Sequence, residues 1–502
     1  MQKLHLWGGI AALALAAGPV LASEMRIGLN EDPDSLDPAQ SRTFVSSLVY
    51  EQLCDRLFNV NEDMEIIPEL ATDWDWSEDG MSLVITLRDD VVHHDGTEMT
   101  GETVRAVLER NMTLPESSRK SELSSIERVE ATGPHEVTIH LTAPDVTLVA
   151  HLSHHAGRIY SPTAAEAAGA GFSSNPVCTG PYRFVQRVAQ DRIVLEKFED
   201  HWDADNYHLD RVIYMPIPDT TVRLSNLRAG DLDMVERVAP PDVPTVQSDS
   251  RLKFFEVPNI GYQGMTFNVG NGPRSEEPLG ADPRVRKALS LAIDREVLNQ
   301  VVFEGLYVPG NQWAAPGTTW YNENDPVPAR DVDAARALLN EAGIDRLAFE
   351  LTTGNAPVAM QAGQVIQAMA AEAGFDITLR VTEFATLLSE NAAGNFQASL
   401  QGWSGRIDPD ANIHVFVSCQ GGNNDGRYCN EEVDAILAEA RTVADPEERK
   451  ALYDRSQEIL AEELPLLYLY HIKYLYAARE SVEGFTPYAD GVIRLAGVTN
   501  NR

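Results

Sequence analysis

The side chains best suited to hold a small molecule are gathered in the segment 403–410, which reads WSGRIDPD. Trp403 offers an aromatic face, and the guanidinium of Arg406 is a planar fork that matches a carboxylate or a phosphate. Gly402, just before this segment, and Gly405 within it allow a ligand to approach the backbone closely. Two interpretations are open: Arg406 contacts a ligand, or it pairs with Asp408 or Asp410 and only orders the loop.

No motif in the chain predicts catalysis. GWSGR does not match the nucleophile motif GxSxG, because Arg406 occupies the position of the second glycine. The sequence contains no HExxH, P-loop or GxGxxG motif. Asp408 and Asp410 could exchange protons with a substrate, but acidic residues are so frequent here that two neighbours carry little information. We therefore expect no enzyme and no cofactor. An exported hydrolase or a chaperone-like protein is the alternative from another class.

Histidines occur in two short clusters that could suggest a metal. One is His93 and His94 beside Asp95, and the other lies at 151–155. Asp95-Gly96 is a hairpin-turn signal, which places His93 and His94 at a strand end, where adjacent side chains point to opposite faces. We therefore expect solvated or structural histidines and no metal.

Four cysteines are present, and their positions favour two disulfides. Cys419 and Cys429 flank a polar, glycine-rich loop that could close into a small ring, which leaves Cys54 and Cys178 as the second pair by elimination. Four cysteines allow three connectivities, and free buried thiols are the alternative. A zinc site is not expected, because no CxxC pair or matching histidine spacing occurs.

The composition describes a folded, strongly acidic protein with more than one lobe. A length of 502 residues exceeds what one hydrophobic core usually supports. Lysine and arginine total 40 against 76 aspartates and glutamates, a formal net charge of −36. Such a charge repels nucleic acids and anionic lipid surfaces, so neither is an expected partner.

The N-terminus has the pattern of a secretory signal peptide. A lysine precedes an apolar run, and small residues at 20 and 22 fit a cleavage site, so we place the cut after Ala22. The first cysteine is Cys54, so no residue near the cut can carry a lipid. The mature protein is therefore expected to be free in the periplasm and not lipid-anchored, where disulfides can form.

Strands and helices alternate along the chain, which is typical of α/β lobes. Asp219 begins and Gly230 ends a predicted helix between strands at 211–219 and 232–238. The same order recurs in the second half. The other predicted elements are helices at 44–58, from Pro283 to Leu298, 331–343, 357–373 and 445–465, strands at 81–88, 136–144, 347–354 and 375–384, a hairpin at 178–198 and a buried strand within 464–478.

The order of motifs resembles that of the extracytoplasmic solute-binding proteins of ABC transporters, family 5, the class that serves peptides and nickel. One such stretch would mean little, but the ordered set is specific and extends over nearly the whole chain after residue 22. The matching stretches are DPDSLDP, PELATDWDWSEDG, LVITLRDDVVHHDGT, NPVCTGPYRF, TFNVGN, DPRVRKALSLAIDR, DVDAARALLNEAG and WSGRIDPD.

The resemblance implies an α/β periplasmic-binding-protein fold of type II, with two lobes and an extra subdomain in the first. Two crossings, near 262–268 and 472–480, would join the lobes, which close on a ligand. The implied division is signal peptide 1–22, first lobe 23–55, extra subdomain 56–174, first lobe again 175–265, second lobe 266–477 and a return to the first lobe at 478–502.

The resemblance also points to the ligand-binding residues. In peptide-binding relatives an acidic residue three positions after the tryptophan of this motif binds the peptide's ammonium group. Here that position is Arg406, so the chain departs from the pattern for a free peptide N-terminus. The expected ligand-binding residues are Trp403, Ser404, Gly405, Arg406 and Asp408 in the second lobe, and Arg42, Thr43 and Phe44 in the first.

The predicted function is capture of a short peptide or peptide-like solute and its delivery to the membrane permease of an ABC importer. An alternative within the same class is an anionic solute that is not a peptide, such as an opine, a glutathione-like compound or a sugar derivative, bound through Arg406. We expect a monomer whose partners are the solute and the permease.

Overall fold

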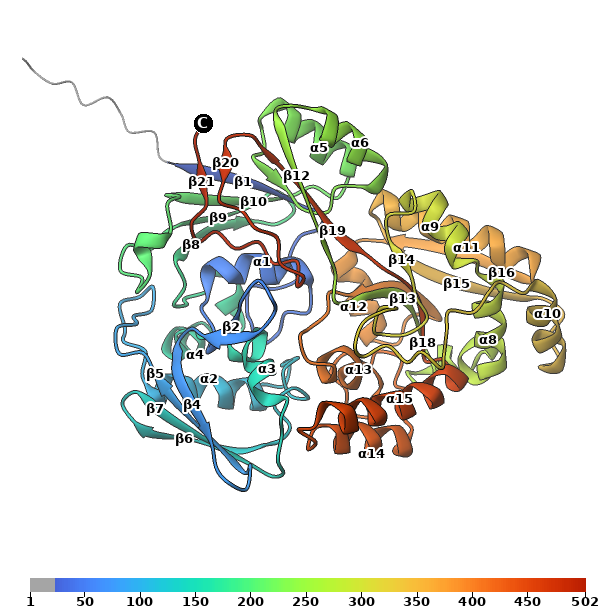
Figure 1. Cartoon of the computed structure of the whole chain (residues 1–502), viewed down its shortest axis with the longest axis horizontal. Helices are drawn as coiled ribbons and strands as arrows, with labels where there is room; N and C mark the ends of the chain where they lie inside the picture. Colours follow the sequence, from blue (N-terminus) through green and yellow to red (C-terminus); the bar gives the residue numbers. More distant parts are fainter. Residues whose placement is uncertain (1–22) are drawn as a thin grey trace, which may run out of the picture.

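The structure is a computed structural model that describes residues 23–502, so the predicted signal peptide, residues 1–22, lies outside the described residues. Figure 1 shows two bodies of sheet and helix side by side, joined through the long strands β12 (Leu252–Pro258) and β19 (Lys473–Arg479). We call the body built on the N-terminal sheet the first lobe and the other body the second lobe. The predicted two-lobed α/β fold is confirmed.

A seven-stranded sheet forms the centre of the first lobe, in the order β12-β19-β11-β1-β10-β9-β8. β1 runs parallel to both β10 and β11, so the C-terminal ends of the three strands meet at one edge. The remaining elements of this part are β1 (Glu24–Leu29), β8 (Tyr182–Val188), β9 (Arg192–Lys197), β10 (Arg211–Pro216), β11 (Met234–Val235), α1 (Phe44–Leu53), α5 (Thr220–Ala229) and α6 (Val243–Ser248).

A smaller sheet with its own helices lies within the segment predicted as the extra subdomain. Its four strands run in the order β4-β5-β7-β6 and are all antiparallel. Figure 1 places it at the lower left. The elements are β2 (Phe58–Val60), β3 (Ile66–Pro68), β4 (Ala71–Trp76), β5 (Ser82–Leu87), α2 (Gly101–Thr113), β6 (Ile126–Gly133), β7 (Glu136–Leu141), α3 (Leu148–Leu152) and α4 (Pro162–Ala168).

The second lobe is built on a six-stranded sheet in the order β14-β18-β13-β17-β15-β16. Its strands are β13 (Tyr262–Phe267), β14 (Val308–Pro309), β15 (Leu347–Gly354), β16 (Phe375–Thr382), β17 (Ala398–Trp403) and β18 (Leu466–His471). Its helices are α7 (Pro278–Ala281), α8 (Pro283–Ala292), α9 (Arg295–Phe303), α10 (Val332–Glu341), α11 (Pro357–Glu372), α12 (Phe384–Ala392), α13 (Asp410–Val417), α14 (Glu431–Ala440) and α15 (Pro446–Glu463).

The chain passes twice between the two large sheets. β12 belongs to the first sheet and β13 to the second, so the first passage is 259–261. The second passage is the single residue Ile472, between β18 and β19. The predicted lobe boundaries at 266 and 478 lie a few residues later in the chain than these passages, and we now propose 262 and 472 for them.

Two elements predicted from the sequence are each two separate elements in the structure. The apolar run 464–478 is not one strand, because β18 pairs with β13 and β14 whereas β19 pairs with β11 and β12 in the other sheet. The helix predicted from Pro283 to Leu298 is two helices. α8 ends at Ala292, and the Asp294 side chain accepts a hydrogen bond from the Val297 amide, which begins α9.

Other boundaries follow the capping chemistry of the sequence. Asp219 accepts from the Val222 amide at 2.9 Å, and Gly230, with φ of 89°, ends α5, as predicted. The helix predicted at 44–58 ends earlier, at Leu53, because Cys54 is extended and joined to Cys178.

The two ends of the described chain lie together. The short strands β20 (Val482–Glu483) and β21 (Thr499–Asn500) pair, and Asn500 donates to the Glu24 carbonyl at 2.8 Å. No helix among residues 23–502 is long and apolar enough to cross a membrane. The described residues also contain five 3-10 turns: η1 (His155–Gly157), η2 (Gly169–Ser174), η3 (Ala204–Asn206), η4 (Pro240–Asp242) and η5 (Pro273–Glu276).

Candidate functional site

A cavity of about 160 Å³ lies between the two lobes, and both lobes line it. At ~10–15 Å³ for each enclosed water, it has room for on the order of ten water-sized groups, which suits a small solute. From the first lobe its walls include Asn30, Glu31, Arg42, Phe44 and Arg237; from the second they include Phe384, Trp403, Ser404, Arg406, Phe416 and Asn423.

The segment 403–410 is positioned by a central strand and by the first passage between the lobes. β17 lies between β13 and β15 and carries Trp403 to its end. The chain then turns at Gly405, whose φ is 83° and where a Cβ would come within 2.5 Å of the Gly261 amide nitrogen. The Ser404 carbonyl accepts from the Asn259 side chain at 3.2 Å. The predicted ligand loop is therefore attached directly to the passage about which the lobes meet.

Asn412, on α13, fixes the conformation of this loop. Its side-chain oxygen accepts from the Trp403 indole at 2.9 Å and from the Arg406 amide at 2.7 Å, and its side-chain nitrogen donates to the Arg406 carbonyl at 2.8 Å. Trp403 meets Phe416 edge to face at 5.0 Å between ring centroids. Trp403 therefore lines the cavity and also packs within the loop.

The charge of Arg406 has no carboxylate partner among the described residues. Its guanidinium lies 4.1 Å above the Trp403 ring and donates to the Ser404 hydroxyl at 3.0 Å and the Gly405 carbonyl at 2.6 Å. No carboxylate oxygen of residues 23–502 lies within 4.0 Å of it. Burial lowers the pKa of Arg406 to about 10, although Glu122 opposes that shift, so the side chain stays cationic at neutral pH.

The two aspartates of the loop are held by other residues. Asp408 accepts from both terminal nitrogens of Arg449, at 2.8 and 2.6 Å. Asp410 accepts two hydrogen bonds from Arg441, both at 2.9 Å. The interpretation in which Arg406 pairs with Asp408 or Asp410 is therefore wrong for this structure. Asp408 lies beside the cavity in a small pocket with Arg406, and its predicted contact with a ligand stays a prediction.

Asp410 also joins the two lobes. Its carboxylate lies 3.1 Å from Nε2 of His151, on α3 of the first lobe, while Arg441 donates to the Ser124 hydroxyl and the Ser121 carbonyl of the same lobe. Burial alone would raise the pKa of Asp410, but Arg441, His414 and His151 hold it well below its usual range. Burial alone would lower the pKa of His151, yet the hydrogen bond and charge of Asp410 raise it.

The predicted first-lobe loop divides into residues that line the cavity and one that does not. Arg42 lines it and reaches across to the second lobe, where it donates to Asp425 at 2.9 Å and Asn423 at 3.2 Å. Phe44 lines it and stacks on Tyr474 at 5.3 Å. Thr43 is buried behind them and donates to Asp34 at 2.8 Å.

Sequence reasoning missed the most polar part of the first-lobe wall. Glu31 follows β1, and Arg237 follows β11, with its guanidinium carbon 5.1 Å from the centre of the Phe44 ring. Parallel strands bring their C-terminal ends to one edge, where open α/β sheets bind ligands. Polar residues that follow the short apolar runs of β1 and β11 were the signal that could have found both.

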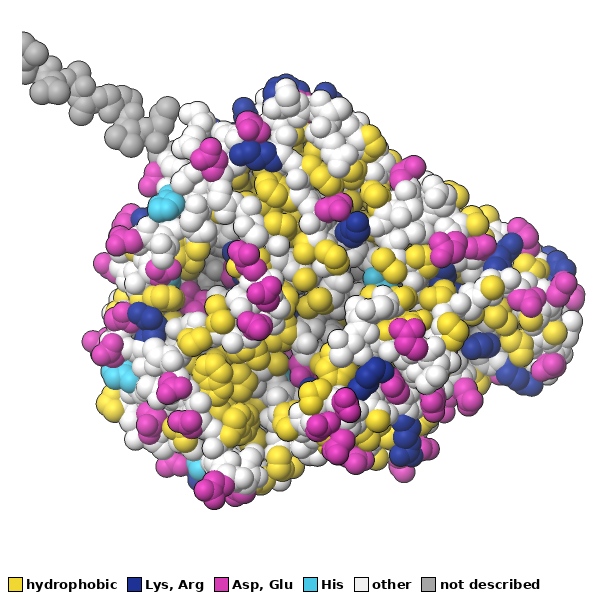
Figure 2. All heavy atoms as spheres, viewed as in Figure 1, with side chains coloured by type: hydrophobic (Ala, Val, Ile, Leu, Met, Phe, Trp, Pro, Cys, Tyr) yellow, Lys and Arg dark blue, Asp and Glu magenta, His cyan; other side chains and the backbone are white. Residues whose placement is uncertain are grey.

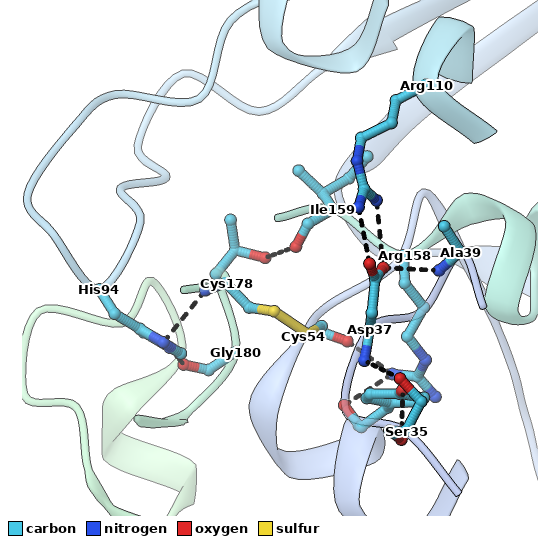
Figure 3. Close-up of a disulfide and its surroundings, with 12 residues drawn as sticks. Ser35, Asp37, Ala39, Cys54, His94, Arg110, Arg158, Ile159, Cys178 and Gly180 are labelled. Carbon is cyan, nitrogen blue, oxygen red and sulfur yellow. Dashed lines mark hydrogen bonds and ion pairs between the residues drawn. A yellow bond between two sulfur atoms is a disulfide. The ribbon is translucent and has the colours of Figure 1, made fainter. Parts of the chain in front are cut away.

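Both predicted disulfides are confirmed. Cys419–Cys429 closes the loop that carries Asn423 and Asp425, the two partners of Arg42. Cys54–Cys178 links the end of α1 to the segment before β8 (Figure 3). In that close-up His94 accepts from the Cys178 amide, which gives this histidine a structural contact.

The other charges and histidines give no sign of a second kind of site. No group of three or more His, Cys, Asp or Glu side chains that could hold a metal ion occurs in the part of the chain that the structure describes. Acidic side chains are spread over the face seen in Figure 2, and basic ones lie singly between them. This face therefore offers no basic patch.

Comparisons with known proteins agree with the geometry. The family model of bacterial extracellular solute-binding proteins, family 5 Middle, matches residues 65–424. The glutathione-binding protein GsiB of Salmonella typhimurium is 27% identical over 497 residues, with 96% of each chain covered. Probable di/tripeptide-binding protein 5 of Pseudomonas aeruginosa is 28% identical over 518 residues, covering 96% of this chain and 97% of that one.

Two solved structures are similar over almost their whole length. The binding protein AgaA of A. tumefaciens R10 in complex with agropinic acid has a TM-score of 0.87 and 25% identity, with 95% of this chain and 99% of that chain covered. The dipeptide-binding protein of Pseudoalteromonas sp. SM9913 in complex with Met-Leu has a TM-score of 0.88 and 23% identity, covering 95% and 100%, and this supports the fold alone.

Proposed function

Because the chain belongs to family 5 of the bacterial extracellular solute-binding proteins, we propose that it captures a small peptide-like solute that carries a carboxylate. The observation that carries this proposal is Arg406, a cation in the wall of a cavity between two lobes, with no carboxylate partner among the described residues. A solute carboxylate would supply the missing anion.

The free energy of this contact is large enough to determine the orientation of the solute. A hydrogen bond to a charged group is worth about 1.5–3 kcal/mol, and a guanidinium can give a carboxylate two at once. Relatives named for glutathione, di- and tripeptides and agropinic acid are consistent with such a ligand. A cavity of about 160 Å³ favours a di- or tripeptide over a long peptide.

Capture would depend on closure of the lobes. The cavity has walls from both lobes, so a bound solute touches both and stabilises the closed arrangement over the open one. The passages at 259–261 and Ile472 are the only connections between the two large sheets in the described chain, and they would serve as the hinge. The closed form would then dock on the permease of an ABC importer and release the solute there.

The setting of this activity is part of the proposal. We propose that residues 1–22 are removed on export and that the mature chain acts in the periplasm as a monomer without a lipid anchor. It makes and breaks no bond in the solute. These statements rest on the sequence pattern and on the family.

A second candidate is an anionic solute that is not a peptide, such as an opine. It is favoured by Arg406 itself, which occupies the position where peptide-binding relatives carry an acidic residue, and by the likeness to AgaA. Both candidates use the same cavity and the same arginine.

The test is native mass spectrometry of the protein purified from its own periplasm, followed by calorimetry with the compound that is found. A series of di- or tripeptides is expected, and one defined acidic metabolite would favour the second candidate. A retained solute without any carboxylate or other anionic group would overturn both.

A further inference from the structure

Glu31 is the acidic side chain of the first-lobe wall of the cavity. It follows β1 at the edge of the sheet where the parallel strands end, and it lines the same cavity as Arg406 of the second lobe. The two aspartates of the ligand loop are held by Arg449 and Arg441, so neither is free to bind a positive charge. Glu31 is therefore the acid that a solute can reach in this wall.

The carboxylate of Glu31 has no ion-pair partner within 4.0 Å and no side-chain hydrogen bond in residues 23–502. The neighbours do not supply one. The next residue along the sheet edge, Arg237, has its Nε 3.4 Å from Glu236, and Glu236 accepts from the Asn30 amide at 2.7 Å. Glu31 is half-buried in the cavity wall, and a partly desolvated carboxylate without a partner in a ligand cavity indicates a position for a cation.

We propose that Glu31 binds a positively charged nitrogen of the solute, so that the cleft selects dipolar solutes with an ammonium at the first lobe and a carboxylate at the second. This inference rests on the function proposed above. It also accounts for a peptide-like ligand in a chain whose loop lacks the expected acidic residue. The acid is supplied by the first lobe, so the ammonium of the ligand lies at the first lobe and not at the loop of the second.

The charges around Glu31 add a measurable consequence. Burial raises the pKa of Glu31 to about 8; Arg237 opposes the shift, and Glu236, Glu383 and Asp34 reinforce it. Arg223, on α5, also lies within range of its charge. At pH 7 the empty cleft therefore holds Glu31 mostly protonated, and an arriving ammonium favours the ionised form, which displaces the proton.

The sign of the pH dependence follows from this displacement. Because the proton must leave Glu31, affinity for an ammonium-bearing solute rises with pH by up to about tenfold per unit, and it is highest near pH 8, above which the solute's own α-ammonium, with a pKa of about 7.7–8.0, loses its proton. A solute that lacks the ammonium gains nothing from ionised Glu31, so its affinity does not rise over this range.

The test uses the mature chain and four probes in calorimetry: Met-Leu, N-acetyl-Met-Leu, Met-Leu amide and N-acetyl-Met-Leu amide. Titrations in phosphate and in Tris at pH 7 measure the protons released. We expect Met-Leu to release nearly one proton and to bind at least tenfold more tightly than its acetylated form. E31Q should abolish the proton release and weaken Met-Leu at least tenfold, with N-acetyl-Met-Leu unchanged.

The matched control is D32N, since Asp32 is the adjacent acid and lies 3.1 Å from Arg187. It should keep both the proton release and the preference for the free amine. Equal binding of Met-Leu and its acetylated form, or proton release that persists in E31Q, would overturn the role of Glu31 while leaving the proposed function intact. Thermal melting confirms that each variant is folded.

If none of the four probes binds, the peptide form of the proposed function fails. The role of Glu31 is then tested with the solute that the protein retains from the periplasm. A retained solute that carries a basic nitrogen and is lost from E31Q but not from D32N supports the inference. A retained solute without a basic nitrogen, or one that E31Q keeps, overturns it.

Discussion

Two groups of charged side chains lie between the lobes, and they differ in whether their charges are matched. At the cavity, Arg406 and Glu31 have no ion-pair partner within the described chain. Behind it, Asp410 is bound by Arg441 and His151. The matched group holds the lobes against each other, whereas the unmatched group leaves room for a solute that brings the opposite charges.

Removing a charge from water costs free energy in both groups, and the groups differ in how that cost is offset. In the matched group the cost is offset by short hydrogen bonds between opposite charges. In the unmatched group it is only partly offset, so burial lowers the pKa of Arg406 to about 10 and raises the pKa of Glu31 to about 8, which keeps Glu31 mostly protonated at pH 7 until a cation arrives. Such sites gain free energy when a ligand of the right charge arrives.

The largest effect is expected from breaking the matched group. Asp410→Ala leaves the buried guanidinium of Arg441 without its carboxylate, and removing one member of a buried pair costs about 3–5 kcal/mol. The free energy of unfolding in urea should fall by this amount. Asp434→Ala, at a partly exposed position on α14, is the control and should lower the free energy of unfolding by less. Equal losses in the two variants would show that the matched group is not a special source of stability.

A change on the unmatched side should affect binding more than folding. Arg406→Ala should weaken binding of the native solute at least tenfold, or about 1.4 kcal/mol, measured by calorimetry. Its free energy of unfolding should stay the same or rise, because an incompletely paired buried charge is removed. Unchanged affinity would show that Arg406 does not contact the solute. Arg449→Ala is the contrasting variant, with lower stability expected.

A smaller effect is expected at the link between the lobes made by Arg42. Arg42→Ala removes its bonds to Asp425 and Asn423 across the cleft, so small-angle scattering should show a more open average in the absence of solute. A double-mutant cycle of Arg42 and Asp425 should give a coupling free energy of about 1 kcal/mol for the closure of the lobes. A coupling near zero would mean that the pair forms only after closure.

The smallest effect is a pH dependence of the matched group. The folded-state pKa of His151 is raised by Asp410, so the charged imidazole contributes stability that is fully present below about pH 6.5. That contribution is lost as pH rises through the raised folded-state value. His151→Gln should remove this part of the decline in urea midpoint, measured with E31Q as the background so that Glu31 does not titrate in the same range.

Much of the fold could be predicted from local patterns. Caps at Asp219 and Gly230 set the ends of α5, and alternating strands and helices predicted the α/β lobes. Failures occurred where pairing at a distance decides. The run 464–478 reads as one apolar strand, but its two halves pair with different sheets. The break between α8 and α9 has a local cause instead, the Asp294 cap at the start of α9, which the sequence-based prediction missed.

The candidate site was only partly visible in the sequence. Trp403, Ser404 and Arg406 of the loop line the cavity, as do Arg42 and Phe44, whereas Gly405 does not, and Thr43 is buried behind the wall. Glu31 and Arg237 were missed, because nothing close to them in sequence marks them as neighbours of Arg406. They reach the cavity through the register of β1 and β11 in a sheet whose edge faces the other lobe.

The sequence by itself determined the family and the acidic charge, favoured the two disulfides, and placed an arginine where the resemblance led us to expect an acid. Only the tertiary structure decided which charges are matched. Asp408 and Asp410 lie within four residues of Arg406, yet their partners are Arg449, Arg441 and His151, tens to hundreds of residues away. The physical reason is that a charge is neutralised by whatever the fold brings within hydrogen-bonding distance, and nearness along the chain does not ensure that contact.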